Sequence, residues 1–204
     1  MIALEQTPDL WTITLDRADK ANSLTEAMLE ELCAITSRDD LPNALVLTGA
    51  GRVFSAGADL DAARAGLATS PLWERLSGQI AGLPCLTIAA LNGTLAGGAF
   101  GMALACDIRL AVPGAKFFYP VMKLGFLPQP SDPARLCALV GPARAKMILM
   151  AGTKIEADEA LAWGLVDRIA APDSLLDDAR ALTADSCAAT QAHVAAIKRL
   201  VAPE

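Results

Sequence analysis

The stretch from Asn92 to Asp107 restricts the fold of this chain more than any other, because a pair of glycines separates two apolar segments there. Leu86–Leu91 has the composition of a buried strand and ends at a turn signal, Asn92-Gly93. Leu95–Cys106 has no polar side chain and is too short to cross a membrane, which favours a helix buried in a core. The first N–H groups of a helix have no partner inside it, and the helix dipole makes that end positive. The backbone N–H of Gly98 is therefore predicted to bind an anion.

The composition is that of a globular protein. Hydrophobic residues make up 53% and charged residues 20% of the 204 residues, which excludes extensive disorder and suffices for a single domain. The formal net charge is −6 and Lys and Arg form no cluster, so nucleic acid is not an expected partner. The five cysteines are scattered without metal-ligand spacing, and the chain shows neither a basic leader nor an apolar run of membrane length. These features predict a cytoplasmic protein with reduced cysteines and no membrane segment.

Strand and helix signals alternate along the chain. Apolar residues recur at helical spacing in Thr25–Ser37, with Thr25 as the N-cap, and Leu72–Leu83 predicts a helix that ends before Pro84. The Ala-rich stretch around Pro71 is interpreted as a mobile loop over a pocket. Further strands are expected at 2–5, 10–15, 44–48 and 108–112, and further helices at 142–150, 157–163 and within 175–201. This order predicts an α/β core with crossover connections over residues 1–132 and a helical C-terminal region over residues 133–204.

A second glycine turn, Phe54–Asp59, also follows a strand. Two backbone N–H groups that converge from separate loops are how proteins build an oxyanion hole, which stabilises negative charge on a carbonyl oxygen. The alternative for either turn alone is close packing of a helix on a strand, for which glycine is also suited. The presence of two such turns favours the oxyanion hole.

The residues around both turns closely resemble the enoyl-CoA hydratase/isomerase family, the crotonases. The similarity is strongest in Ala44–Leu60 and Ile88–Asp107. It extends over nearly the whole chain through Leu15–Arg17, Asn22–Leu24, Leu124-Gly125, Pro128, Arg135-Leu136, Gly141, Thr153 and Ala162–Val166. The resemblance implies a crotonase-type spiral of ββα units with a helical C-terminal region shorter than usual, a homotrimer or a dimer of trimers, and no cofactor except the coenzyme A of the substrate.

The resemblance also implies the positions of an acyl-CoA site. The thioester oxygen would lie between the N–H groups of Ala58 and Gly98, where charge grows as the adjacent carbon becomes an enolate. The nucleotide and pantetheine would lie along Lys20-Ala21 and along the second turn, at Ala56, Ala58, Asp59 and Leu60, as well as Gly98. Alternatively, Lys20 is an ordinary surface lysine that contacts only solvent.

Two departures from the family bear on the chemistry. The family's hydratases use two glutamates for acid-base work, and the corresponding positions here are Gly101 and Val121. Residues three apart share a helix face, so Gly101 is expected beside Gly98 at the pocket, where it offers space but no proton. Hydration by two glutamates is therefore not expected.

Other acids and nucleophiles are few. Asp132 and Tyr119 are the nearest candidates for an acid or base, although Asp132 before Pro133 is typical of a helix N-cap and Tyr119 among aromatic residues is typical of a pocket wall. The single histidine, His193, fits a solvated helix position and cannot by itself form a metal site. Ser55 with His193 would suggest a serine hydrolase, but Ser55 lacks the usual strand-to-helix elbow motif.

These residues are compatible with three functions. The first is an acyl-CoA enzyme of enoyl-CoA hydratase/isomerase type that stabilises a thioester enolate. The second is a non-catalytic or degenerate acyl-CoA-binding paralogue that has lost both glutamates. The third, the serine hydrolase, has the least support.

Overall fold

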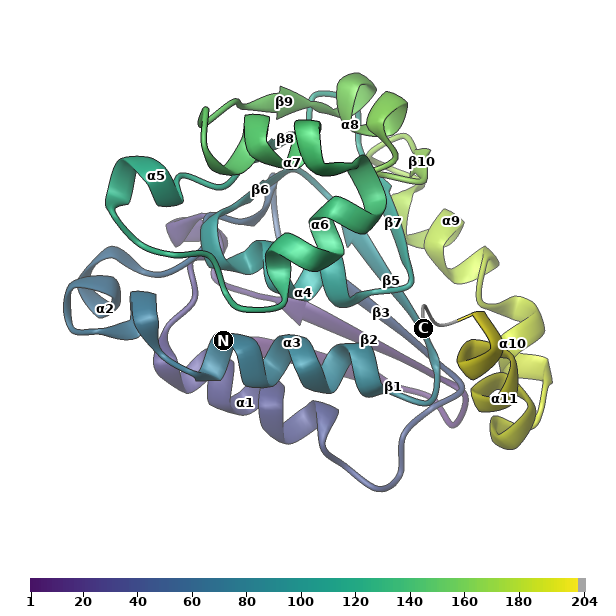
Figure 1. Ribbon diagram of the computed structural model, residues 1–204. Helices are drawn as coiled ribbons and strands as arrows, with labels where there is room; N and C mark the ends of the chain where they lie inside the picture. The colour runs from purple at the N-terminus through teal and green to yellow at the C-terminus, as the bar shows by residue number, and fades with distance from the viewer. Residues whose placement is uncertain (202–204) are drawn as a thin grey trace.

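The computed structural model describes residues 1–201, which form two β-sheets covered by helices (Figure 1). The larger sheet has the strand order β1-β2-β3-β5-β7-β10, and only β1 and β2 pair antiparallel. Its strands are β1 (Ile2–Gln6), β2 (Leu10–Leu15), β3 (Ala44–Gly49), β5 (Leu86–Leu91), β7 (Ile108–Ala111) and β10 (Arg168–Ile169). The buried strands β3 and β5 are apolar except for one buried threonine in each, Thr48 and Thr87, as expected for parallel strands covered on both faces.

The smaller sheet was not predicted from the sequence. It has the order β4-β6-β8-β9 and contains β4 (Val53–Ser55), β6 (Thr94–Ala96), β8 (Lys116–Phe118) and β9 (Ile155–Glu156). The strands β3, β5 and β7 of the larger sheet are each followed by a strand of the smaller sheet and then by helix. This repeat is the expected spiral of ββα units. It sets the turns after β4 and β6 next to each other, because these two strands pair in parallel.

The helix predicted over Leu95–Cys106 is shorter than expected. Leu95 and Ala96 are extended in β6, Gly97–Ala99 form a 3-10 turn, and α4 covers only Phe100–Ala105. Leu95 pairs with Ser55 of β4 and Phe117 of β8. A run that is apolar throughout does not distinguish a buried strand from a buried helix, so the neighbouring strands decide the conformation of its first residues.

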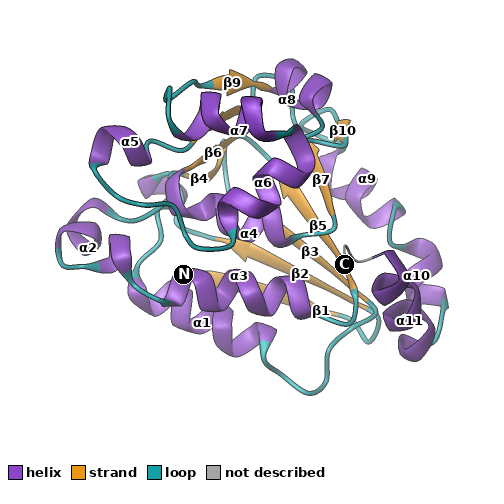
Figure 2. Ribbon diagram, viewed as in Figure 1, coloured by secondary structure: helices purple, strands orange, loops and turns teal. Residues whose placement is uncertain are grey.

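Helices cover the larger sheet from the side seen in front in Figures 1 and 2. Here α1 (Glu26–Thr36) and α3 (Leu72–Gly82) pack together, and α4 packs between α3 and α6 (Asp132–Val140). Thr25 is the N-cap of α1, as predicted, since its Oγ1 accepts a hydrogen bond from the Met28 N–H. The stretch before Pro71 is not the loop that was expected, because it contains α2 (Leu60–Arg64) and a 3-10 turn whose Leu67 is buried.

The remaining helices are α5 (Val121–Leu124), α7 (Pro142–Leu149), α8 (Ala157–Trp163), α9 (Leu175–Ala181), α10 (Ala184–Ala188) and α11 (Gln191–Val201). The helix α11 is held against the larger sheet, because Lys198 Nζ lies 2.8 Å from Asp107 Oδ2 and donates to the Cys85 carbonyl.

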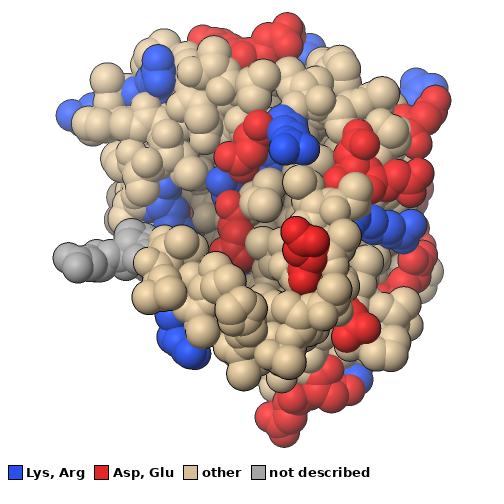
Figure 3. All heavy atoms as spheres, turned by 90° about the vertical axis from the view of Figure 1, so that its right-hand side faces the viewer, with Lys and Arg blue, Asp and Glu red and all other residues tan. Residues whose placement is uncertain are grey.

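The face that carries α9 to α11 has acidic side chains interspersed with basic ones and no continuous basic surface (Figure 3). No helix within residues 1–201 is both long and apolar enough to span a membrane. The five cysteines are all free.

Candidate active site

The two glycine turns are in direct contact. Gly57 and Gly97 both have positive φ angles, 90° and 57°. A Cβ at Gly57 would lie 2.9 Å from the Ala96 carbonyl oxygen and 3.3 Å from the Gly97 Cα, so no side chain fits there. The close approach of the turns requires glycine at position 57. It brings the next residue of each turn, Ala58 and Gly98, to the same pocket.

Within the described residues, the N–H groups of Ala58 and Gly98 have no hydrogen-bond partner. Ala58 pairs with Leu24 in an isolated parallel bridge. In this bridge the Leu24 N–H donates to the Gly57 carbonyl and the Asp59 N–H donates to the Leu24 carbonyl, so the Ala58 N–H is not used. Gly98 lies in the 3-10 turn that leads into α4, where the first N–H groups have no carbonyl one turn earlier. No hydrogen bond within residues 1–201 has either N–H as its donor. Both N–H groups are thus available to a ligand oxygen.

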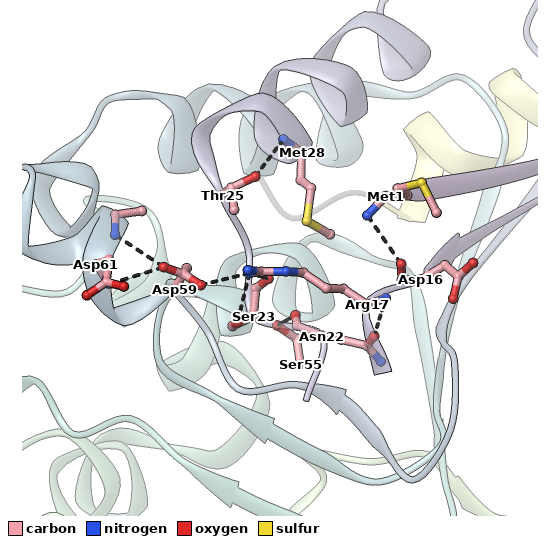
Figure 4. A network of polar contacts seen from close by, with 11 residues as sticks. Met1, Asp16, Arg17, Asn22, Ser23, Thr25, Met28, Ser55, Asp59 and Asp61 are labelled. Carbon is pink, nitrogen blue, oxygen red and sulfur yellow. Dashed lines mark hydrogen bonds and ion pairs between the residues drawn. The ribbon is translucent and has the colours of Figure 1, made fainter. Parts of the chain in front are cut away.

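A polar network holds the turn that carries Ala58 (Figure 4). Arg17 Nη1 donates to Asp59 Oδ2 at 2.8 Å and to the Ser23 carbonyl. Asp59 Oδ1 accepts from the N–H groups of Asp61 and Ala62 and so caps α2. The hydrogen bond from Arg17, with those backbone donors, holds the pKa of Asp59 below its usual range. Both oxygens of the Asp59 carboxylate are thus used to hold Arg17 and the start of α2. The Asp59 side chain therefore stabilises the turn.

Asn22 joins the loop before α1 to the same region. Its Oδ1 accepts from the Arg17 N–H at 2.8 Å, and its Nδ2 donates to the carbonyls of Ala50 and Val53 at 2.8 and 2.7 Å. Asn22 is completely buried and has a φ of 50°. The Ala56 N–H donates to the Ala21 carbonyl at 3.0 Å, so the structure brings together the two segments that were predicted to contact coenzyme A. Lys20 is exposed at the edge of this loop.

Asn22→Ala is expected to destabilise the protein by about 2 to 4 kcal/mol, because the hydrogen bonds of the buried Asn22 amide to the partly buried carbonyls of Ala50 and Val53 are lost and alanine is unfavourable at positive φ. The free energy of unfolding from urea denaturation measures the change. Gln191→Ala is the matched control, since that exposed amide donates one hydrogen bond to the Leu41 carbonyl, and its loss should cost about 1 kcal/mol or less. Equal effects of the two substitutions would contradict the proposed role of Asn22.

The pocket at the two turns has a volume of about 250 Å³ and is mostly apolar. It contains no charged side chain among its lining residues, which are Ala56, Ala58, Leu60, Ala63, Ala68, Trp73, Gly97, Gly98, Tyr119, Pro120, Val121, Leu124, Phe126, Leu127 and Gln129. Trp73 of α3 forms one wall, and a Cβ at Gly98 would lie 3.2 Å from its indole ring. The indole is fixed because its Nε1 donates to the Leu67 carbonyl. Trp73 was not predicted to take part in the site.

The prediction that Gly101 leaves space at the pocket is wrong. Gly101 is buried in α4 and does not line the pocket. A Cβ built on it would lie 3.1 Å from Asp132 Oδ1 and 3.4 Å from Ser77 Oγ. The space beside Gly101 is therefore filled by the carboxylate of Asp132. Val121 does line the pocket, and it offers no acid there.

The interpretation of Asp132 as a helix N-cap is also wrong. Asp132 is the first residue of α6, and no backbone N–H within residues 1–201 donates to its side chain. It is 1% exposed, and its Oδ2 accepts a hydrogen bond from Tyr119 Oη at 2.9 Å. Burial raises the pKa of Asp132 to about 6, although Tyr119 and Arg135 favour the charged form. Burial, with the nearby Asp132 charge, also raises the pKa of Tyr119. The structure thus pairs the two residues that were predicted as candidate acids.

Ser55 and His193 do not form a catalytic pair. Ser55 is fully buried, where its Oγ donates to the Asn22 carbonyl and accepts from the Gly57 N–H. His193 lies on α11 and lines a separate hollow of about 460 Å³ that shares no residue with the pocket. Ser55 shapes the turn before Ala58, and the serine hydrolase interpretation is excluded. Within residues 1–201, no group of three or more His, Cys, Asp or Glu side chains is placed to hold a metal ion.

The sequence model of the enoyl-CoA hydratase/isomerase family matches residues 5–203. The chain belongs to this family. A carnitinyl-CoA dehydratase from Salmonella arizonae is 38% identical over 198 residues, which cover 92% of this chain and 75% of the relative. A "probable enoyl-CoA hydratase" from Mycobacterium tuberculosis is 35% identical over 187 residues, 88% of this chain and 72% of that protein. The crystal structure of an enoyl-CoA hydratase from Bacillus anthracis superimposes with a TM-score of 0.88 at 32% identity, over 97% of this chain and 81% of that chain.

Membership of the enoyl-CoA hydratase/isomerase family confirms the predicted fold class. Within this family fold, sequence reasoning missed the packing of Trp73 against Gly98 and the burial of Asp132. Helical spacing placed Trp73 on a helix, but its partner across the pocket depends on how α3 packs against α4. The sequence did not indicate that Asp132 would be buried, since an aspartate before proline at a helix start usually has a capping role.

Proposed function

We propose that this chain binds an acyl-CoA and stabilises the enolate of its thioester between the N–H groups of Ala58 and Gly98. One observation carries the proposal, namely that Ala58 and Gly98, whose N–H groups have no partner within residues 1–201, come from separate turns and line one apolar pocket. Negative charge moves onto the thioester oxygen when a proton leaves the α-carbon, and fixed donors stabilise that charge more than they stabilise the neutral ester. An apolar wall strengthens the effect because little water competes for the donors.

The coenzyme A part would lie along the loop at Lys20 and Ala21 and along the turn from Ala56 to Leu60. The hydrogen bond between Ala56 and Ala21 makes these segments one continuous surface. The Asp59 carboxylate is already engaged by Arg17 and by the start of α2, so Asp59 would contribute through its backbone. The exposed Lys20 would contact a phosphate of the nucleotide. A homotrimer remains part of the proposal, and the exposed apolar side chains of Met147, Met150 and Leu161 support it.

An acyl group without charge should bind best, because no carboxylate or cation from residues 1–201 lines the pocket and a buried charge without a partner is costly. Butyryl-CoA is expected to bind at least about tenfold more tightly than carnitinyl-CoA or succinyl-CoA, a difference of about 1.4 kcal/mol. Isothermal titration calorimetry with the three thioesters, and with free coenzyme A as the control, measures this preference. Tighter binding of either charged thioester would contradict the proposed acyl pocket.

A non-catalytic acyl-CoA-binding protein is the second candidate, and the absence of glutamate at positions 101 and 121 favours it. The two functions differ in turnover. Incubation with enoyl-, dienoyl- and saturated acyl-CoA thioesters, followed by mass spectrometry of the products, separates them. An enzyme changes at least one thioester or exchanges its α-protons with solvent, whereas a binding protein returns all of them unchanged.

A further inference from the structure

One buried carboxylate oxygen has no hydrogen-bond partner. Asp132 is 1% exposed, and its Oδ1 is the only buried side-chain oxygen or nitrogen within residues 1–201 that lacks a partner. Leaving such a group unsatisfied usually costs stability, so proteins rarely keep one without a functional reason. Its other oxygen is held by Tyr119 at 2.9 Å. The position of this carboxylate therefore needs an explanation beyond packing.

Asp132 and Gly101 fit each other. The φ of Gly101 lies outside the left-handed range, so its backbone does not demand glycine. The neighbours impose the restriction, because a Cβ at position 101 would lie 3.1 Å from Asp132 Oδ1. A carboxylate from α6 thus occupies the space that a side chain from α4 would otherwise take. The carboxylate thus lies beside Gly101, three residues after the pocket-lining Gly98.

Tyr119 connects this carboxylate to the pocket. It is a pocket-lining residue, and its ring stacks on Phe100 with the centroids 5.3 Å apart, which fixes its orientation. Its hydroxyl donates to Asp132 Oδ2 and accepts from the Gln129 N–H at 3.4 Å. A phenolic oxygen has two lone pairs, so one remains for a further proton. Tyr119 can therefore exchange a proton on the pocket side while Asp132 takes one on the buried side.

We propose that Tyr119 and Asp132 form a proton relay for the α-carbon of the bound thioester, an inference that rests on the proposed function. As the C–H bond breaks, its electron pair moves towards the carbonyl oxygen and forms the enolate held by Ala58 and Gly98. The proton goes to Tyr119 Oη, while the original hydroxyl proton passes to Asp132 Oδ2. The proton received by Tyr119 lies on the pocket side and exchanges there with solvent, after which the reverse transfer returns a solvent proton to carbon. Tyr119 is the catalytic residue, and Asp132 is a positioning residue that acts through it.

Three ionisable groups set the charge of Asp132. Arg135 of α6 stabilises the carboxylate, Glu74 of α3 opposes it, and Tyr119 donates to it. Burial outweighs these contacts and raises the pKa of Asp132 from 3.8 to about 6. The relay needs the ionised carboxylate to accept a proton, so α-proton exchange should rise with pH and level off above about pH 6.

The test follows the exchange of the α-protons of butyryl-CoA in D₂O by NMR. Asp132→Asn and Tyr119→Phe should each slow the exchange by about 10² to 10⁴-fold. Calorimetry should show butyryl-CoA binding close to that of the wild type. Asp158→Asn makes the same chemical change at an exposed position of α8 and is the matched control, with exchange unchanged. The rise of the rate near pH 6 should be present in the wild type and absent from Asp132→Asn.

A stability measurement gives a second readout. The folded state holds the Asp132 proton between pH 3.8 and about 6 whereas the unfolded state has lost it, so wild-type stability falls over that range. The urea midpoint of the wild type should therefore decrease relative to that of Asp132→Asn as the pH rises from about 4 to 6.

Three results would overturn the relay. If the wild type exchanges α-protons and both variants exchange them equally fast, the relay is wrong and the enolate proposal stands. If the wild type binds butyryl-CoA without exchanging its protons, both proposals fail. If Asp132→Asn does not fold, Tyr119→Phe and the wild-type pH profile decide, and a rate independent of pH around 6 counts against Asp132.

Discussion

Gly98→Pro is expected to lower kcat for acyl-CoA turnover by about 10² to 10³-fold, the usual cost of one lost oxyanion donor. Proline has no N–H, so the thioester oxygen would keep only the Ala58 donor. Affinity for the ground-state thioester should fall less than kcat, because the donor interacts most strongly with the charge of the enolate. Steady-state kinetics with the thioester that turns over fastest measure both quantities.

Gly98→Ala is the matched control for this substitution. Alanine keeps the N–H but places a Cβ about 3.2 Å from the Trp73 ring, so it tests the effect of crowding alone. We expect Gly98→Ala to change KM through the displaced indole and to retain much more of kcat than Gly98→Pro. Equal losses of kcat would show that crowding, and not the missing donor, explains the effect.

Hydration of crotonyl-CoA is expected to be slower than α-proton exchange in a saturated acyl-CoA by about 10² to 10⁴-fold. Water must lose a proton as it attacks, and the α-carbon must gain one. Gly101 and Val121 supply no acid or base, and the pair of Tyr119 and Asp132 supplies one relay for two transfers. Absorbance of the conjugated thioester follows hydration, and NMR follows exchange on the same preparation.

Hydration of crotonyl-CoA by the Val121→Glu variant, compared with hydration by the wild type, tests whether a second acid is missing. Val121 lines the pocket and is 8% exposed, so a carboxylate there could reach a bound water molecule. The variant should hydrate crotonyl-CoA faster than the wild type if the second acid is what is missing. Wild-type hydration as fast as exchange would mean that a group other than Tyr119 or Asp132 activates the water.

The sequence predicted those features that depend on local chemistry or on glycine. Thr25 is the N-cap of α1, and the strands with alternating or largely apolar patterns lie close to their expected ends. The two glycine turns were expected to meet, and the contact between Gly57 and Gly97 confirms it. The cap and the turns could be predicted because their own residues set the local conformation, whereas the meeting of the two turns was expected from the resemblance to the family.

Features that depend on long-range packing could not be predicted in the same way. Leu95 and Ala96 are extended because β4 and β8 pair with β6, and those strands are only three residues long. The buried contact between Asp132 and Tyr119 joins residues 13 apart in the sequence across an irregular, proline-containing segment. No periodic pattern indicates which way a side chain points from such a segment.

The most direct test of the oxyanion hole is the infrared frequency of the thioester carbonyl of butyryl-CoA labelled with ¹³C at that carbon. Hydrogen bonds from Ala58 and Gly98 would polarise the C=O bond, so the bound thioester should absorb at lower frequency than the free one, and Gly98→Pro should reduce the shift. A bound carbonyl that absorbs at the frequency of the free thioester, under conditions where calorimetry shows saturation, would contradict the assignment of these two N–H groups.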